Sequence, residues 1–330
     1  MRTTTIINKN WRFHLGDLEY AWYKGYDDSD WRGVTLPHDW SVERPFGEGH
    51  SSGTGYVCGG VGWYRLRFTL PEGIENKSVW VTFGGVYKNA RVWCNTNYLG
   101  MRPSGYATFT HDISPFAQPG ENVLAVRVEH NDLADSRWFT GSGIYRDVTL
   151  TIADKVHFVP DGVFVSTRST DKNKAVLRIE WELSEKGEVS FELGGARVNA
   201  FGKTGSTILC IEKPKLWSPD TPALYTLACR AGEDRLEIPF GIRTFSFDAD
   251  TGFTLNGVSM KLKGVCLHHD AGALGAAVPK CVWRRRLRKL KAAGCNAIRT
   301  AHNPPDTHLL DLCDEMGFLV MDEAFDEWEG

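Results

Sequence analysis

The sequence predicts a multidomain, mainly β protein: a jelly-roll β-sandwich, an immunoglobulin-like β-sandwich and the first part of a truncated (β/α)8 TIM barrel. Residues 1–153 and residues 154–246 each show the two-residue periodicity of β-strands, whereas residues 247–330 alternate short apolar strands with helical patterns. A chain of 330 residues is also too long for a single hydrophobic core. We therefore expect three domains with these bounds.

Strands in the first domain are predicted from strict alternation of apolar and polar side chains. Apolar residues occupy the even positions of 64–70 and of 148–152. Turn-forming residues, such as Gly84-Gly85, separate the strands. Because no long segment of this domain shows helical spacing, we expect an antiparallel sandwich of jelly-roll size.

The second domain repeats the alternating pattern, at 177–183 and again at 189–193. Pro214, Pro219 and Pro222 mark a loop between strands. About seven short strands fit in this region, which is typical of an immunoglobulin-like sandwich. The Cys…Trp…Cys pattern of antibody domains is missing, so only the architecture is implied.

The third domain opens with a hairpin signal. Asn256-Gly257 is a residue pair typical of a type I′ turn, here between predicted strands at 253–255 and 260–262. The apolar stretch 262–267 then predicts the first strand of a new pattern.

A helix is predicted after this strand, because Trp283, Leu287 and Leu290 recur at helical spacing before Gly294. The residues between them are mostly Arg and Lys, which indicates a solvated helix face.

A second strand and a second helix follow. Residues 296–300 predict the strand, and Asn303-Pro304 offers a helix start with proline in the first turn. Gly317 is the expected stop of that helix, and 318–321 predict a third strand.

Strand, helix, strand, helix and strand in this order predict a parallel β/α array. A closed barrel needs eight strands, and the third strand would leave an unpaired apolar edge of the kind that natural domains avoid. We therefore expect the sequence to be the N-terminal part of a longer protein.

Composition excludes several classes of partner. A net charge of −3 with interspersed signs argues against nucleic acid and favours a neutral partner. No apolar run reaches the roughly 20 residues that span a bilayer, so no membrane partner is expected. The 12 Trp and 10 Tyr suit β-sandwich cores as well as carbohydrate-binding faces. The first residues lack the apolar region of a signal peptide, which leaves a cytoplasmic or a periplasmic location open.

The eight Cys include no Cys-x-x-Cys pair. Several fall within apolar strand or helix stretches, where a free Cys behaves as a small hydrophobe. We expect reduced core residues rather than a zinc or disulfide framework.

Each predicted strand of the third domain ends in polar or ionisable side chains. Catalytic groups of β/α barrels lie where strands end and loops begin, so three such ends in succession predict the edge of an active site. The three groups are His268-His269-Asp270, then Arg299 with His302 and Asn303, then Asp322 with Glu323, Asp326 and Glu327.

Two kinds of hydrolysis fit such an edge. Metal-assisted hydrolysis would use His and carboxylate ligands. Because consecutive residues point to opposite faces of a strand, at most one of His268 and His269 reaches the site. Glycoside hydrolysis needs two carboxylates, with Arg and His to orient them and to bind hydroxyl groups.

Two stretches of the third domain form a longer motif: residues 296–305 (Asn-Ala-Ile-Arg-Thr-Ala-His-Asn-Pro-Pro) and residues 312–323. They are similar to the first signature of glycoside hydrolase family 2, and the sequence resembles that family, close to its bacterial β-galactosidases. The family order of sugar-binding jelly roll, immunoglobulin-like domain and TIM barrel matches the three regions. Shorter supporting motifs are Leu-Pro-His-Asp-Trp at 36–40, Gly-Trp-Tyr-Arg at 62–65, Gly-Ser-Gly-Ile-Tyr-Arg-Asp-Val at 141–148, Leu-Trp-Ser-Pro at 216–219, Phe-Gly-Ile-Arg at 240–243 and Leu-Lys-Gly-Val at 262–265.

The resemblance implies roles for several residues. Arg299 resembles the family Arg that hydrogen-bonds the nucleophilic carboxylate, and a bidentate guanidinium would hold that Glu ionised and oriented. His302 is similar to a His that contacts the sugar and favours the transition state, and His268 to a sugar-contacting His at the first strand end. Arg137, before Trp138, lies where a jelly-roll loop of some relatives touches galactose, although a structural Arg fits this loop equally well.

Further support for the site is expected from Asn303, Asp322 and Asp326. Glu327 falls where some members place a magnesium ligand, but the partner His of those members is Glu329 here. No cofactor is required by the resemblance, and magnesium or sodium in the full-length enzyme is left open.

The two essential carboxylates are expected outside this chain. In the family, the acid/base Glu ends the fourth barrel strand and the nucleophile Glu ends the seventh, so both would lie beyond Gly330. The resemblance thus implies a retaining β-galactosidase that hydrolyses terminal β-galactosides, of which this chain alone has no meaningful turnover.

Several alternatives stay open. Within the family they are a β-glucuronidase and a β-mannosidase. Outside it, residues 1–153 could act as a carbohydrate-binding module, the sandwiches could serve as an oligomer scaffold, or the protein could be a metal-dependent hydrolase. A carbohydrate is the expected partner, and homo-oligomer formation is left open.

Overall fold

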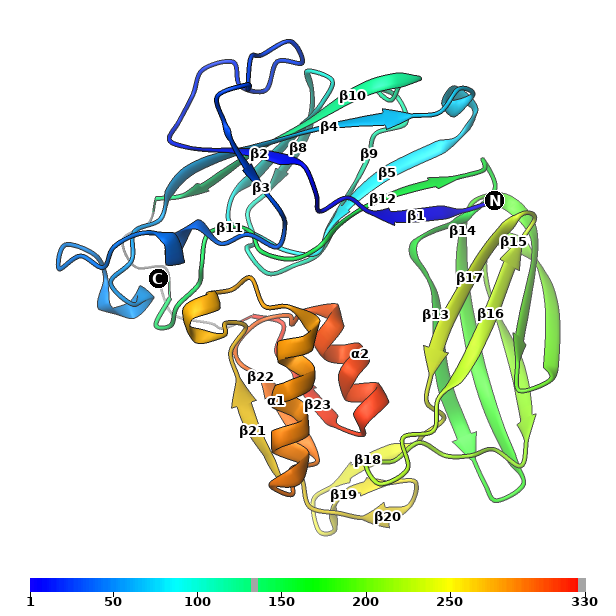
Figure 1. Cartoon of the computed structure of the whole chain (residues 1–330). Helices are drawn as coiled ribbons and strands as arrows, with labels where there is room; N and C mark the ends of the chain where they lie inside the picture. The colour runs from blue at the N-terminus through cyan, green and yellow to red at the C-terminus, as the bar shows by residue number, and fades with distance from the viewer. Residues whose placement is uncertain (132–135, 326–330) are drawn as a thin grey trace.

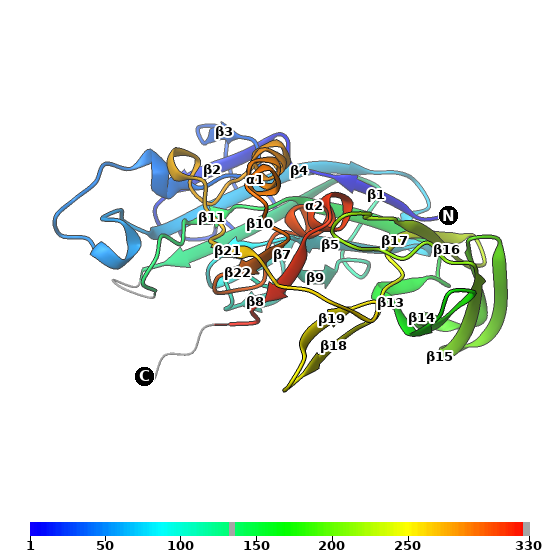
Figure 2. The same ribbon diagram turned by 90° about the horizontal axis from the view of Figure 1, so that it is seen from below.

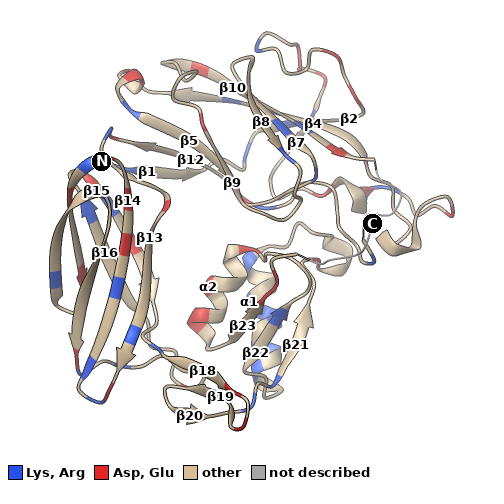
Figure 3. Ribbon diagram, turned by 180° about the vertical axis from the view of Figure 1, so that it is seen from behind, with Lys and Arg blue, Asp and Glu red and all other residues tan. Residues whose placement is uncertain are grey.

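The computed structural model describes residues 1–131 and 136–325, which form three parts (Figure 1). In that view the jelly roll lies at the top, the second sandwich at the right, and the short β/α part below the jelly roll. Lys and Arg are interspersed with Asp and Glu over all three parts (Figure 3). Among the described residues, no helix has the length and apolar character needed to cross a membrane.

The jelly roll contains a six-stranded antiparallel sheet. Strands β4 and β10 pair along their whole length, and alternate β4 side chains such as Tyr64 and Leu66 enter the core. In sheet order the strands are β3 (Arg32–Val34), β2 (Trp11–Leu15), β4 (Gly60–Leu70), β10 (Gly120–His130), β7 (Ala90–Cys94) and β8 (Asn97–Arg102).

A four-stranded sheet completes the jelly roll, with one hydrophobic core that takes residues from both sheets, including Trp11 and Val81. This arrangement confirms the predicted jelly-roll sandwich. The strands of the second sheet are, in order, β1 (Thr3–Ile6), β12 (Val148–Ala153), β5 (Ser78–Phe83) and β9 (Phe109–Asp112), and the short pair β6 (Val86–Tyr87) and β11 (Gly143–Ile144) lies beside them. Short 3-10 helices cover Trp40–Glu43, Ser52–Thr54, Ile74–Asn76 and Gly272–Leu274.

The second sandwich uses fewer and longer strands than expected. They are β13 (Phe158–Thr170), β14 (Lys174–Leu193), β15 (Ala196–Glu212), β16 (Tyr225–Ala231) and β17 (Asp234–Phe240). The separate strands predicted at 177–183 and 189–193 are one strand, β14, with a pairing irregularity between Glu182 and Gly187. Its first half pairs with β13 and its second half with β16, so one long strand links both neighbours around a single core.

A small antiparallel sheet follows, made of β18 (Phe245–Asp248), β19 (Gly252–Leu255) and β20 (Val258–Ser259), and it projects from the molecule in Figure 2. Asn256 and Gly257 have φ angles of 52° and 76°, as a type I′ turn requires. The turn lies where predicted, but its second strand begins at Val258 rather than at residue 260. A two-residue turn places its flanking residues opposite each other, here Leu255 and Val258.

The third part is a parallel sheet of β21 (Gly264–Leu267), β22 (Ala297–Thr300) and β23 (Leu319–Asp322). Helices α1 (Lys280–Ala292) and α2 (Thr307–Met316) connect these strands. Side chains of both helices pack with Ile298 of β22 in one hydrophobic core. The predicted parallel β/α array is therefore confirmed as a partial TIM barrel.

The start of α2 differs from the prediction. Its N-cap is Asp306, whose side chain accepts a 2.9 Å hydrogen bond from the backbone N–H of His308. Asn303 does not cap this helix, because Pro304 is followed by Pro305, and a residue that precedes a proline is held away from helical angles. The helix ends at Gly317, at a φ of 74°, as predicted.

Candidate active site

The carboxyl ends of the three parallel strands lie side by side and face the jelly roll. Register places Leu267, Thr300 and Asp322, the last residues of these strands, in one row across the sheet. The polar residues that follow each strand are therefore brought to one edge, which is where β/α barrels carry their catalytic groups.

Arg299, His302 and Glu323 form the centre of this edge. The Arg299 guanidinium Nε donates to Oε1 of Glu323. The other carboxylate oxygen, Oε2, lies 3.0 Å from Nδ1 of His302. One carboxylate thus holds a guanidinium and an imidazole from the neighbouring strand in a fixed orientation.

Thr300 and Asp322 hold the backbone at Glu323 in place. The Thr300 hydroxyl donates to Oδ1 of Asp322 over 2.9 Å and accepts the backbone N–H of Glu323 over 3.2 Å. Asp322, which the sequence assigned to the site, therefore fixes the end of β23 in this structure.

The jelly roll supplies an aromatic wall to the site. The Trp138 ring lies 4.9 Å from the His302 ring and 5.7 Å from that of His268, between ring centroids. Its indole N–H donates to the hydroxyl of Tyr106 over 3.1 Å. A flat aromatic face beside two imidazoles suits the C–H face of a sugar ring.

Trp138 and Tyr106 are functional candidates that the sequence reasoning missed. Trp138 was noted there only as the neighbour of Arg137. Neither residue lies in a strand-end motif, and both are more than a hundred residues from the barrel part in sequence, so no local signal marked them. Arg137 itself is exposed on this loop.

The two consecutive histidines point to different neighbours. The ring of His268 lies 5.3 Å from the ring of His302, within the site. His269 turns away, and its Nε2 lies 2.9 Å from the carbonyl oxygen of Thr140 in the jelly roll. Burial lowers the pKa of His269 to about 4, so it is neutral near pH 7 and acts as an interface residue.

Two buried polar atoms at the site have no hydrogen-bond partner among the described residues: Nδ1 of His268 and the side-chain amide nitrogen of Asn303. Both residues line a small cavity of about 10 Å³, close to the space that a single water molecule needs. A buried polar atom without a hydrogen bond costs free energy. A bound hydroxyl group or water would satisfy both of these atoms.

Residues 141–148 of the jelly roll contact the barrel part beside the site. Buried Arg146 donates to the carbonyl oxygens of Tyr106 and Pro304, at 2.9 Å each. Asp147 lies 2.9 Å from Nε2 of His308 in α2. Arg146 therefore connects the aromatic wall directly with the loop that carries His302.

Asp39 makes a second connection between the two parts. Its carboxylate accepts backbone N–H groups of Ser41, Ser142 and Ala276, each over 2.9 Å. The side chain is almost fully buried, and burial raises its pKa. Gly275 must be a glycine here, because a Cβ on it would lie 2.2 Å from Oδ2 of Asp39 and its φ is +60°.

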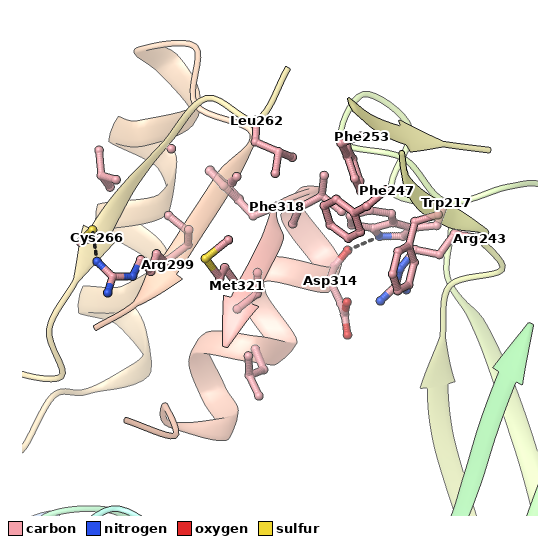
Figure 4. A pocket seen from close by; sticks show the side chains of 18 residues that line it. Trp217, Arg243, Phe247, Phe253, Leu262, Cys266, Arg299, Asp314, Phe318 and Met321 are labelled. Atoms are coloured by element: carbon pink, nitrogen blue, oxygen red, sulfur yellow. Dashed lines mark hydrogen bonds between the residues drawn. The ribbon is translucent and has the colours of Figure 1, made fainter. Parts of the chain in front are cut away.

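The face of the parallel sheet that the helices do not cover is open. It lines a pocket of about 580 Å³ that extends to Trp217 and Phe253 of the neighbouring part (Figure 4). Met321 is 57% exposed on this face, and Arg299 lies at one end of the pocket beside Cys266.

The predicted metal ligand cannot be placed. Glu327, together with Asp326, lies outside the described residues. Within 1–131 and 136–325, no three His, Cys, Asp or Glu side chains gather closely enough to hold a metal ion. A magnesium or sodium site therefore stays a prediction.

Three family models match successive parts of the chain. The sugar binding domain of glycosyl hydrolases family 2 matches residues 7–153, the central family 2 model matches 161–243, and the family 2 TIM barrel domain matches 249–328. The domain boundaries set at 153 and 246 stay predictions.

Known proteins similar to the chain are glycosidases. It is 43% identical to the β-galactosidase BoGH2A of Bacteroides ovatus, over 99% of this chain and 42% of that protein. It is 39% identical to a putative β-glucuronidase of Formosa agariphila, over 99% of this chain and 33% of that protein. A β-glycosidase structure from Bacteroides vulgatus matches with a TM-score of 0.92 and 40% identity, over 99% of this chain and 45% of that one.

The chain spans less than half the length of these three proteins, and it matches three family 2 models in the order that the fold shows. Arg299, His302 and Glu323 lie within the residues that the TIM barrel model matches, at the strand ends where such barrels act. From its three domains and its site, the chain belongs to glycoside hydrolase family 2.

Proposed function

We propose that this chain is the first part of a retaining β-galactosidase, in which it binds and orients the sugar that leaves the non-reducing end of a β-galactoside. The observation that carries the proposal is the strand-end cluster of Arg299, His302 and Glu323 beneath the Trp138 ring. The similarity to a β-galactosidase over nearly the whole chain supports it.

The cluster suits sugar binding better than bond cleavage. Retaining hydrolysis needs two carboxyl groups about 5–5.5 Å apart, one as nucleophile and one as acid/base. Glu323 already contacts Arg299 and His302, which favours an orienting role for its carboxylate. Arg299 keeps further N–H groups that can hold a second carboxylate ionised.

The open sheet face supports a role as part of a larger barrel. In a closed barrel, alternate strand residues such as Met321 point into a packed interior. Here β21 and β23 have no further parallel neighbour among the described residues. This open face supports the proposal that the acid/base and nucleophile carboxylates lie on further barrel strands of the parent protein.

A β-glucuronidase is the second candidate, because one close relative carries that name. A glucuronide differs from a galactoside by a carboxylate, which a site would bind with a free cation. The identity to the β-galactosidase is higher than that to the putative β-glucuronidase, at 43% against 39%, which favours the galactoside.

The substrate proposal is tested with the gene carried through to its natural stop codon. The purified protein is assayed with 4-nitrophenyl β-galactoside, β-glucuronide and β-mannoside under identical conditions. We expect kcat/KM for the galactoside to exceed the others by at least about a hundredfold, since one hydroxyl or carboxylate mismatch in a polar site is costly. A preference for the glucuronide would reject the β-galactosidase assignment and leave the family assignment intact.

A further inference from the structure

The outer face of the six-stranded jelly-roll sheet carries a second aromatic groove. Side chains of β4, β7 and β10 alternate, so Trp63, Trp93 and Arg127 point away from the jelly-roll core. The segment between β2 and β3 lies along this face, at the top of Figure 1 and away from α1 and α2. The groove is therefore separate from the strand-end site.

Aromatic rings form the floor and one wall of the groove. Trp63 and Trp93 stack with ring centroids 5.4 Å apart and an interplanar angle of 28°. Trp22 lines the same cavity. The ring centroid of Tyr20 lies 6.2 Å from that of Trp22, and Tyr20 is 64% exposed. Trp63 is buried, so it supports the half-buried Trp93 from the side of the protein.

Charged side chains flank these rings. Asp17 accepts two hydrogen bonds from Arg127, of 2.9 and 2.7 Å, and a third of 3.2 Å from the indole N–H of Trp63. The Nη1 atom of Arg91 lies 3.6 Å from Oε2 of Glu129 on the neighbouring strand. The carboxylate of Asp17 is more than half exposed and keeps free acceptor positions, and the outer N–H groups of half-exposed Arg91 can donate to a ligand.

The segment that forms the upper wall is rigidly held. Fully buried Arg65 donates to the carbonyl oxygens of Ala21, Tyr23 and Lys24, and its Nε donates to Asp28 over 2.7 Å. Because one guanidinium holds this segment through four hydrogen bonds, the segment loses little conformational entropy when a ligand binds.

The cavity has a volume of about 370 Å³, within the range of small-molecule sites. Flat rings match the C–H faces of a sugar, and the exposed carboxylate and guanidinium groups match paired hydroxyls. Opposite charges lie side by side here, so neither a polyanion nor a polycation is favoured. We infer that this groove, lined by Asp17, Trp22, Arg91, Trp93 and Arg127, is a secondary binding site for a neutral oligosaccharide.

The inference does not depend on the proposed β-galactosidase activity. A groove of this kind would keep a glycan chain on the protein while another part of it is cut, which raises the local substrate concentration. It would function in this chain alone, whether or not the barrel is complete.

The test is isothermal titration of the 330-residue chain with three neutral probes: β-1,4-galactotetraose, cellotetraose and xylotetraose. A sulfated chondroitin tetrasaccharide serves as the anionic comparison. We expect at least one neutral probe to bind and the anionic one not to bind. Trp93→Ala and Arg91→Ala, the latter at a half-exposed position, should each weaken that binding by about fivefold or more, since a contact that contributes about 1 kcal/mol changes affinity by about fivefold.

The matched control is Trp138→Ala, which removes an indole from the strand-end site and should leave groove affinity unchanged. Circular dichroism of each variant checks that the jelly roll is folded. Binding that Trp138→Ala abolishes and Trp93→Ala preserves would overturn the inference, as would the absence of binding by all three neutral probes at millimolar concentration. Sedimentation showing that Trp93→Ala dissociates a dimer of the chain would also overturn it, because the face would then be an interface between copies.

Discussion

Arg146 offers the sharpest test of how the jelly roll positions the candidate site. Its buried guanidinium donates to the carbonyl oxygens of Gly84, Tyr106 and Pro304, which come from two domains. Arg146→Met keeps most of the aliphatic volume and removes all three donors. The barrel part should then be attached less firmly to the jelly roll.

The size of the effect follows from which carbonyl groups lose the donor that Arg146 supplies. The Gly84 oxygen also accepts from the hydroxyl of Thr108, so it stays paired. The Tyr106 and Pro304 oxygens each lose a 2.9 Å hydrogen bond from Arg146. At about 1–3 kcal/mol for each unpaired buried group, less the partial relief from water entry at Pro304, we expect a loss of about 2–4 kcal/mol.

The assay is urea unfolding of the 330-residue chain, followed by tryptophan fluorescence and by hydrogen exchange of residues 301–316. The matched control is Arg285→Met on the exposed side of α1, which should change stability by less than about 0.5 kcal/mol. A loss below about 1 kcal/mol for Arg146→Met, with unchanged exchange in 301–316, would refute the positioning role of Arg146.

Three further predictions concern other contacts of the same interface. The pair of His308 and Asp147 should stabilise the chain between about pH 4 and 6.5, because their mutual hydrogen bond raises the pKa of His308 above its ordinary 6.5 and lowers that of Asp147 below 3.8. The contribution is lost as pH rises through the raised pKa of His308 and as it falls through the lowered pKa of Asp147. His308→Gln should therefore cost about 1 kcal/mol at pH 6 and almost nothing at pH 9, measured by thermal unfolding; an equal loss at both pH values would contradict the ion pair. Trp138→Ala should shift the NMR resonances of the His302 ring, since the indole lies 4.9 Å away, and unshifted resonances would place the indole elsewhere in solution. Asp39→Ala should cost about 2–4 kcal/mol, because three backbone N–H groups lose their acceptor, and a near-neutral effect in urea unfolding would contradict that count.

Local signals predicted those features that depend on a few neighbouring residues. Gly317 ends α2 and Asn256-Gly257 forms the turn, because both positions need positive φ angles that other residues avoid. The continuity of β14 was missed because the polar stretch Ser184–Gly187 looks like a turn in isolation. Residues 183–186 bulge out of the pairing with β15, where only Lys203 lies opposite them, and the pairing resumes at Gly187.

The candidate site likewise combines features that local sequence predicts with features that it does not predict. The strand ends with Arg299, His302 and Glu323 follow from the parallel order of strands, which the sequence predicts. The aromatic wall of Trp138 and Tyr106 depends on how the jelly roll docks against the barrel part, and that arrangement is set by long-range contacts such as Arg146 to Pro304. No local pattern encodes such a contact.

The central claim is that this chain holds sugar-orienting residues but neither of the two carboxylates that cleave the glycosidic bond. It is tested by measuring hydrolysis of 4-nitrophenyl β-galactoside by the 330-residue chain and by the product of its gene carried to the natural stop codon. We predict turnover by the longer protein and none above background by the chain. Turnover by the chain alone would contradict the claim, and Asp322 and Glu323 would then become candidates for the missing acid/base and nucleophile.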